Sequence, residues 1–142
     1  MHEYLFRGKR IDNGEWVEGY YLYRGEECSK IGTDVHYIVT HDLCGFSWHE
    51  VIPETVGQYT GLTDKNGKKI FEGDIIRYVN LLGKRVNAFV KIDITVASWM
   101  CESFYKDKEQ GFLSNWIGES GGYVIGNIHD NPELLKGGDG NA

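Results

Sequence analysis

The chain has 142 residues, a mass of 16.2 kDa, a net charge of −6 and a sequence pI near 5.3. This length suits one domain that can bury a core without a metal or disulfide staple. The acidic balance disfavours a protein that binds by neutralising phosphates, and no apolar run approaches the ~20 residues of a membrane span. The first residues also lack the apolar segment of a signal peptide.

Composition favours many short strands joined by tight turns. Glycine is abundant at 19 residues, proline is scarce at 2, and aromatic residues make up 13% of the chain. Glycine supplies the left-handed backbone that tight turns need, and aromatic side chains suit a pleated, half-buried surface. The three cysteines, Cys28, Cys44 and Cys101, are odd in number and show no paired spacing, so we expect reduced thiols in a cytoplasmic protein.

The first fifty residues predict two hairpins separated by a polar loop at 24–34. In the first hairpin, Tyr4–Arg7 and Trp16–Tyr23 flank a primed turn at Asn13-Gly14. Both faces of Trp16–Tyr23 carry bulky side chains, so alternation does not say which face is buried. In the second hairpin, 36–40 and 46–52 pair around the turn His41–Gly45, and Pro53 ends the last strand.

Residues 52–76 are the most legible stretch of the chain. They predict a strand at 56–59, a turn at Asn66-Gly67, a short strand at 69–71 and a bend at Gly73 into a strand at 74–80. Next, apolar residues alternate with polar ones from Val86 to Val96, which predicts a strand with one buried face. The parity changes after Val96, and a bulge near Val96-Ala97 or a turn there would explain it.

The remaining residues carry weaker signals. We expect one helical turn near 105–110, a last strand at 123–128, and a short helical turn capped by Asn131 with Pro132 at its first position. Residues 137–142 have the composition of a disordered tail.

Taken together, these elements predict a mainly β protein with little helix. The strands would form a small SH3-like barrel or two packed β-layers, with an added N-terminal sheet. We expect a single domain over 1–136, with a subdivision at about 1–52 and 53–136 left open. So many strands create sheet edges, and self-association into a homo-oligomer is one way to cover them.

Three segments resemble the YopX family of phage and prophage proteins. They are Phe6–Tyr21 (FRGKRIDNGEWVEGYY), the stretch 52–76, and Val124–Leu135 (VIGNIHDNPELL). The resemblance spans nearly the whole chain in the family's order. It implies a β-rich fold, a phage or prophage origin and self-association, and it implies no catalytic residues, because the family is one of uncharacterised function.

Two candidate sites have a structural explanation beside the chemical one. Glu72 and Asp74 could act as a general acid and base in a hydrolytic enzyme, although Glu-Gly-Asp also suits a bend into a strand. A further set, His36, His41, Cys44, His49 and Cys28, has metal-ligand side chains, but its spacing matches no common zinc module. We therefore expect neither a catalytic site nor a cofactor.

A nucleic-acid-binding module is the main alternative hypothesis. Small β-barrels can bind single strands with basic and aromatic side chains, although the net charge disfavours this here. The residues that could contact a macromolecule are Arg7, Lys9, Arg10, Trp16, Tyr59 and Lys65. The leading hypothesis is a non-enzymatic, cytoplasmic, self-associating protein that binds a phage or host macromolecule.

Overall fold

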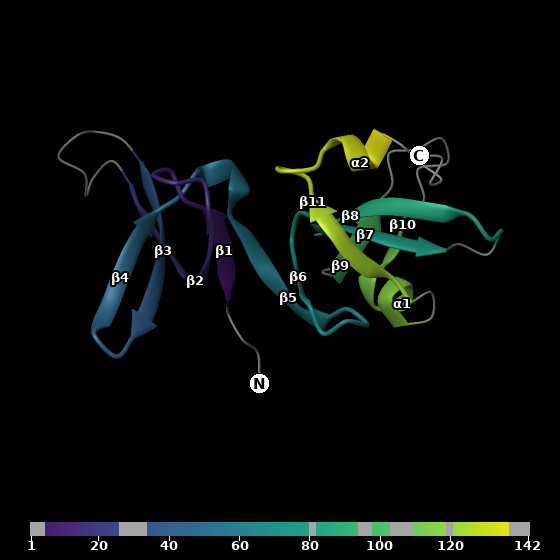
Figure 1. Cartoon of the computed structure of the whole chain (residues 1–142), viewed down its shortest axis with the longest axis horizontal. Coiled ribbons are helices and arrows are strands. Elements are labelled where there is room, and N and C mark those ends of the chain that lie inside the picture. The colour runs from purple at the N-terminus through teal and green to yellow at the C-terminus, as the bar shows by residue number, and fades with distance from the viewer. Residues whose placement is uncertain are drawn as a thin grey trace. The chain divides into compact units, whose positions relative to one another are not determined.

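The chain folds as two compact units, Met1–Tyr59 and Thr60–Ala142 (Figure 1). The computed structural model describes residues 5–25, 34–79, 82–93, 98–102, 110–118 and 121–136. The predicted disordered tail at 137–142 lies outside these residues. No helix within them is long and apolar enough to cross a membrane.

Antiparallel strands make up most of the described chain. The first unit holds β1 (Phe6–Lys9), β2 (Trp16–Arg24), β3 (Val35–Asp42), β4 (Gly45–Glu50), the 3₁₀ turn η2 (Pro53–Thr55) and the start of β5 (Gly57–Thr63). The second unit continues with β6 (Lys69–Phe71), β7 (Asp74–Val79), β8 (Arg85–Asp93), β9 (Ser98–Glu102), β10 (Gln110–Phe112), α1 (Leu113–Gly118), β11 (Tyr123–Asn127) and α2 (Glu133–Lys136).

The strands form two sheets, with orders β4-β3-β2-β1-β5-β6 and β10-β9-β8-β7-β11. A mainly β fold with little helix is thereby confirmed. Of the two architectures that the sequence left open, the described strands form open sheets rather than a closed SH3-like barrel.

Both predicted hairpins of the first unit are present. Gly14 has the left-handed φ of 72° that the Asn-Gly signal predicts. The loop is longer than a two-residue primed turn, because the Arg10 amide bonds the Glu15 carbonyl and leaves 11–14 between them. In the second hairpin, Asp42 pairs with Gly45 around the tip residues Leu43 and Cys44.

The end of β4 turns back onto the end of β1. Arg10 and Val51 form an isolated antiparallel bridge, and the Ile52 amide donates to the Lys9 carbonyl at 2.9 Å. The fully buried Val51 packs against Gly8, where an added Cβ would lie 3.0 Å from the valine side chain. Gly8 is therefore needed for close approach of the chain rather than for a turn.

The stretch 52–76 forms the elements that the sequence predicts. Strands β5 and β6 flank the turn at Gly67, and Gly73, with φ 91°, bends the chain into β7. Asp74 is buried beneath this bend, where its Oδ2 accepts a hydrogen bond of 2.8 Å from the Phe71 amide.

Asp64 joins the β5–β6 turn to β11. Its Oδ1 accepts hydrogen bonds from the Asn66 and Lys68 amides at 2.8 and 3.0 Å, and its Oδ2 accepts one from the Val124 amide at 3.0 Å. Burial by itself would raise the pKa of Asp64, but these three amides and the charge of Lys68 outweigh it and lower the pKa.

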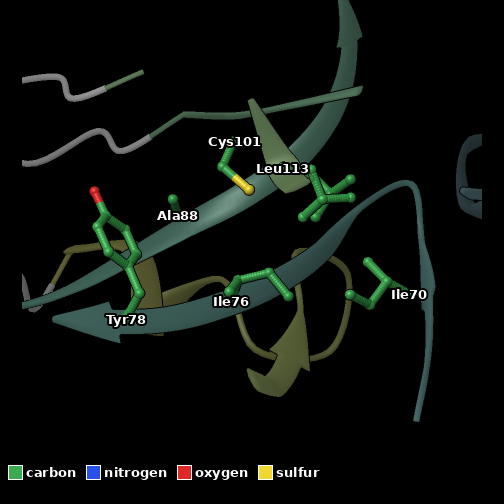
Figure 2. Close-up of a cluster of buried hydrophobic side chains, with 7 residues drawn as sticks. Ile70, Ile76, Tyr78, Ala88, Cys101 and Leu113 are labelled. Carbon is green, nitrogen blue, oxygen red and sulfur yellow. The ribbon is translucent and has the colours of Figure 1, made fainter. Parts of the chain in front are cut away.

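The core of the second unit lies on one face of its sheet (Figure 2). Its buried members are Ile70, Ile76, Tyr78, Ala88, Val90, Cys101 and Leu113. The helix α1 supplies Leu113 and places Trp116 on Tyr78, with stacked rings 4.0 Å apart. The predicted alternation along β8 is confirmed here by Ala88 and Val90.

The hairpin of β8 and β9 accounts for the parity change after Val96. Ile92 pairs with Trp99 and Val90 with Cys101, so even positions of β8 share a face with odd positions of β9. The reversal of the chain between the two strands is enough to change the parity, as the predicted turn would. The residues between, 94–97, lie outside the described part of the chain.

The opposite face of the same sheet carries α2. Asn87 is buried there and donates from Nδ2 to the Leu134 carbonyl at 2.8 Å, while its Oδ1 accepts a hydrogen bond of 3.0 Å from Arg77 Nε. The predicted helical turn after Pro132 is therefore confirmed, but the Asn131 side chain bonds back to the Asn127 amide instead of capping it.

The predicted helical turn at 105–110 lies almost wholly outside the described residues. The described chain has a short helix that the sequence did not predict, α1 at Leu113–Gly118, which packs on the core. Residues 103–109 lie outside the described chain, while Gln110 already belongs to strand β10.

Candidate macromolecule-binding surface

One of the two acidic residues considered for catalysis, Asp74, has a structural role in the bend at Gly73. Asp74 is almost fully buried and bonds the Phe71 amide, which is the role of a residue that shapes the bend at Gly73. Glu72 is half-buried on the same connection. The geometry at Asp74 therefore agrees with the interpretation of Glu-Gly-Asp as a bend into a strand.

The described metal-ligand residues are divided between the two faces of the first unit's sheet. His41 lies on one face, where its ring is 4.7 Å from that of Phe46. His36 and His49 lie on the other, bonded to Tyr21 Oη at 2.6 Å and to Thr40 Oγ1 at 3.1 Å. In the described part of the chain no three such residues are placed to share an ion, and Cys28 lies outside it.

Of the six residues predicted to contact a macromolecule, Arg7, Lys9 and Trp16 share one face of the first sheet by the register of β1 and β2, and Lys65 is not placed with them. Five of them, Arg7, Lys9, Arg10, Trp16 and Tyr59, belong to the first unit, and Lys65 belongs to the second. Lys65 Nζ lies 4.6 Å from the centre of the Tyr123 ring.

Several of these side chains already have intramolecular contacts. Arg7 is only 9% exposed and lies over Trp16, 4.7 Å from the ring centre, and Tyr59 is also 9% exposed. Arg10 forms a salt bridge of 2.6 Å with Asp12, and its hydrogen bond to that carboxylate raises the pKa of Arg10. Buried or paired side chains offer less to a partner than open ones do.

Sequence reasoning missed a more open surface on β2, β3 and β4, which we call the aromatic face. The strand registers align Tyr20 with Val39 and Val39 with Trp48, and they align His41 with Phe46. Side chains directly opposite each other on antiparallel strands share a face. These residues therefore form one continuous surface across the three strands.

The aromatic face is exposed at its centre. Tyr20 is 62% exposed, Phe46 67% and Trp48 53%, whereas Val39 between them is buried. The Tyr37 ring contacts the Trp48 ring edge-to-face on this surface, with 5.4 Å between ring centres. The three large rings expose together about 350 Å², which is comparable to the largest apolar patch of a typical monomer.

The reverse face of the same strands is the packed one. Ile38 is fully buried there, and Tyr21 stacks on His36 and contacts Phe6. Burial raises the pKa of Tyr21. The sequence signal for the aromatic face was that Trp16–Tyr23 carries bulky side chains on both faces. Only one of these faces is needed for the core, so the other could be exposed.

Comparison with known proteins identifies the family and the fold of the chain. The family model described as YopX protein matches residues 5–136, nearly the whole chain. The chain belongs to the YopX family. No curated protein matches this YopX chain.

A solved structure resembles this YopX-family chain in fold. It is the crystal structure of protein EF1440 from Enterococcus faecalis, with 23% sequence identity and a TM-score of 0.50. The match covers 95% of this chain and 99% of that chain. The resemblance extends through both units, and at this identity it concerns the fold alone.

Proposed function

We propose that this chain is a non-enzymatic binding protein whose aromatic face docks another macromolecule. The observation that carries the proposal is the exposure of Tyr20, Phe46 and Trp48 on one surface of the first unit. Aromatic residues are enriched at protein interfaces and dominate binding energies, and a patch of this size often marks an interaction site. The buried Val39 between the rings and the half-buried Tyr37, whose ring contacts Trp48, restrict the movement of the rings before binding.

A protein partner fits this surface better than a nucleic acid does. The carboxylates of Glu18 and Glu50 lie on the same face as the rings, with Arg24 at one end of β2. Arg7 and Lys9 share this face opposite Glu18 and Trp16, but Arg7 is only 9% exposed. Carboxylates beside the rings repel phosphates, and the chain as a whole carries a charge of −6. The partner in this proposal is a phage or host protein that presents an apolar surface.

Origin, assembly and location belong to the same proposal. YopX membership supports a phage or prophage source, and the open strands support self-association. The free thiols of Cys44 and Cys101 support a reducing compartment such as the cytoplasm.

Affinity capture from a bacterial host, followed by mass spectrometry, tests the proposal when wild type is compared with variants of the face. Tyr20→Ser and Trp48→Ser should each lose a partner that wild type retains, because each removes an exposed ring. Val79→Ser is the matched control, since Val79 is an exposed apolar residue of the second unit. An identical set of captured proteins for wild type and both face variants, with folding intact by circular dichroism, would refute the proposal.

A further inference from the structure

Part of β4 has no strand on its outer side among the described residues. β4 is the last strand in the order of its sheet and lies at the outer edge of the first unit's strands in Figure 1. The Val51 amide donates to the His36 carbonyl on β3, whereas the Glu50 carbonyl accepts from the Ile11 amide on the other side. The backbone groups of successive residues in an antiparallel strand point to alternate sides.

This alternation identifies the open backbone groups. Gly45, Ser47 and His49 direct their amides and carbonyls toward β3, since they share the parity of Val51. Phe46 and Trp48 share the parity of Glu50 and direct theirs outward. The Glu50 carbonyl already accepts a hydrogen bond from the Ile11 amide, so the open part of the edge is centred on the backbone groups of Phe46 and Trp48.

The residues on this edge do not discourage pairing. Natural proteins protect exposed edges with Lys, Pro, bulges or inward-pointing charges. Here the two residues whose backbone groups point outward, Phe46 and Trp48, are aromatic. Their side chains belong to the aromatic face. An edge of this kind favours addition of another strand.

We infer that the occupant is a second copy of this chain, whose β4 pairs antiparallel with β4 about a two-fold axis at Ser47. This inference rests on the proposed function, because it gives part of the aromatic face a partner. Phe46 of each copy lies opposite Trp48 of the other, and each such pair exchanges both backbone hydrogen bonds. The rings of the two copies then form one aromatic cluster across the junction.

Charge and hydrogen bonding select this register. A two-fold axis at Trp48 would place Phe46 opposite Glu50, whose carbonyl already bonds the Ile11 amide. An axis at Glu50 would set the two Glu50 carboxylates directly opposite each other, which is destabilising. The axis at Ser47 uses both open residues and opposes no like charges.

The area available predicts a weak dimer. From their exposed fractions, Phe46 and Trp48 expose about 250 Å² per copy, so the junction removes at most about 500 Å² of aromatic surface from water. Stable interfaces bury roughly 1,200–2,000 Å² in total, and smaller ones belong to transient complexes. We expect a dissociation constant on the order of 10 µM rather than an obligate dimer.

Sedimentation velocity tests the dimer over a range from about 1 to 200 µM. Wild type should shift from monomer to dimer across this range, and Phe46→Lys should remain monomeric, because it places like charges at the junction. Tyr20→Ser is the matched control, since Tyr20 lies on the aromatic face but on β2, away from the edge. It should lose the captured partner yet dimerise as wild type does, which separates failure of this inference from failure of the proposed function.

Cysteine cross-linking tests the register independently of affinity. The two Ser47 residues form a non-hydrogen-bonded pair with Cα atoms about 4.5 Å apart, within the range that a disulfide spans. In a chain with Cys28 and Cys44 replaced by Ser, Ser47→Cys should cross-link on mild oxidation and His49→Cys should not. A monomer at every concentration, a Phe46→Lys variant that still dimerises, or cross-linking at 49 in place of 47 would each overturn the inference.

Discussion

Replacement of Asp64 by Asn should destabilise the second unit by about 2 kcal/mol at neutral pH. The side chain of Asp64 is buried and accepts hydrogen bonds from three amides. An Asn oxygen in place of Oδ1 can keep the bonds from Asn66 and Lys68, but its NH2 group then faces the Val124 amide. A hydrogen bond to a charged group contributes about 1.5–3 kcal/mol, and this substitution removes one outright.

The difference between wild type and Asp64→Asn should shrink in acid. The amides lower the pKa of Asp64 in the folded chain below the unfolded value of about 3.9. The stabilisation is therefore complete above about pH 3.9 and is lost as the pH falls through the folded-state pKa. Wild type should lose stability over that acid range, while the variant has no carboxyl at this position to titrate.

Urea denaturation at pH 7 and in acid measures this difference, and hydrogen exchange of the Val124 amide gives a local readout. Asp12→Asn is the control, because hydrogen bonding to Arg10 also lowers the pKa of Asp12 but that carboxyl is fully exposed. The control should leave the urea midpoint unchanged. Two results would refute the reasoning. One is a loss of unfolding free energy below about 0.5 kcal/mol for Asp64→Asn at pH 7. The other is a difference in stability between wild type and variant that persists unchanged in acid.

Three further predictions follow from buried or strained positions. Burial raises the pKa of the Cys101 thiol far above its usual value, so a thiol reagent near pH 8 should label Cys44 quickly in the native protein and Cys101 only after unfolding; comparable native labelling would contradict this. Gly111→Ala should cost about 1–3 kcal/mol and alter tryptophan fluorescence, because the added Cβ would lie 2.6 Å from Nε1 of Trp116; an unchanged thermal midpoint would show that Trp116 shifts freely. Gly73→Ala should cost about 1–2 kcal/mol in denaturant titrations, because its φ of 91° suits only glycine, and a neutral effect would place that bend elsewhere.

Local signals predicted most of the elements because their causes are local. Gly14, Gly67 and Gly73 all have the positive φ that their turn sequences predict. The alternation along β8 likewise marks the face that carries Ala88 and Val90 in the core. Turn chemistry and period-two alternation depend on neighbouring residues, so they can be read without the fold.

The errors arose where distant contacts decide the structure. The helix α1 forms at Leu113–Gly118 because Leu113 and Trp116 cover the core beside Cys101 and Tyr78, and no periodicity in this short segment announces it. The basic residues near the N-terminus appeared available to a partner, but Arg7 lies over Trp16 in the folded chain. Spacing along the sequence does not reveal which side chains become each other's partners.

By itself, the sequence determined the β-rich class, the family resemblance and the positions of the main turns. The tertiary structure decided which side of the N-terminal strands is buried. Trp16–Tyr23 carries bulk on both faces, so its pattern fits either orientation. Val51 bridges to Arg10 and packs on Gly8 on the face that contains the buried Ile38, whereas Tyr20, Phe46 and Trp48 lie exposed on the opposite face. That choice depends on a contact between residues some forty positions apart, and it creates the surface on which the proposed function rests.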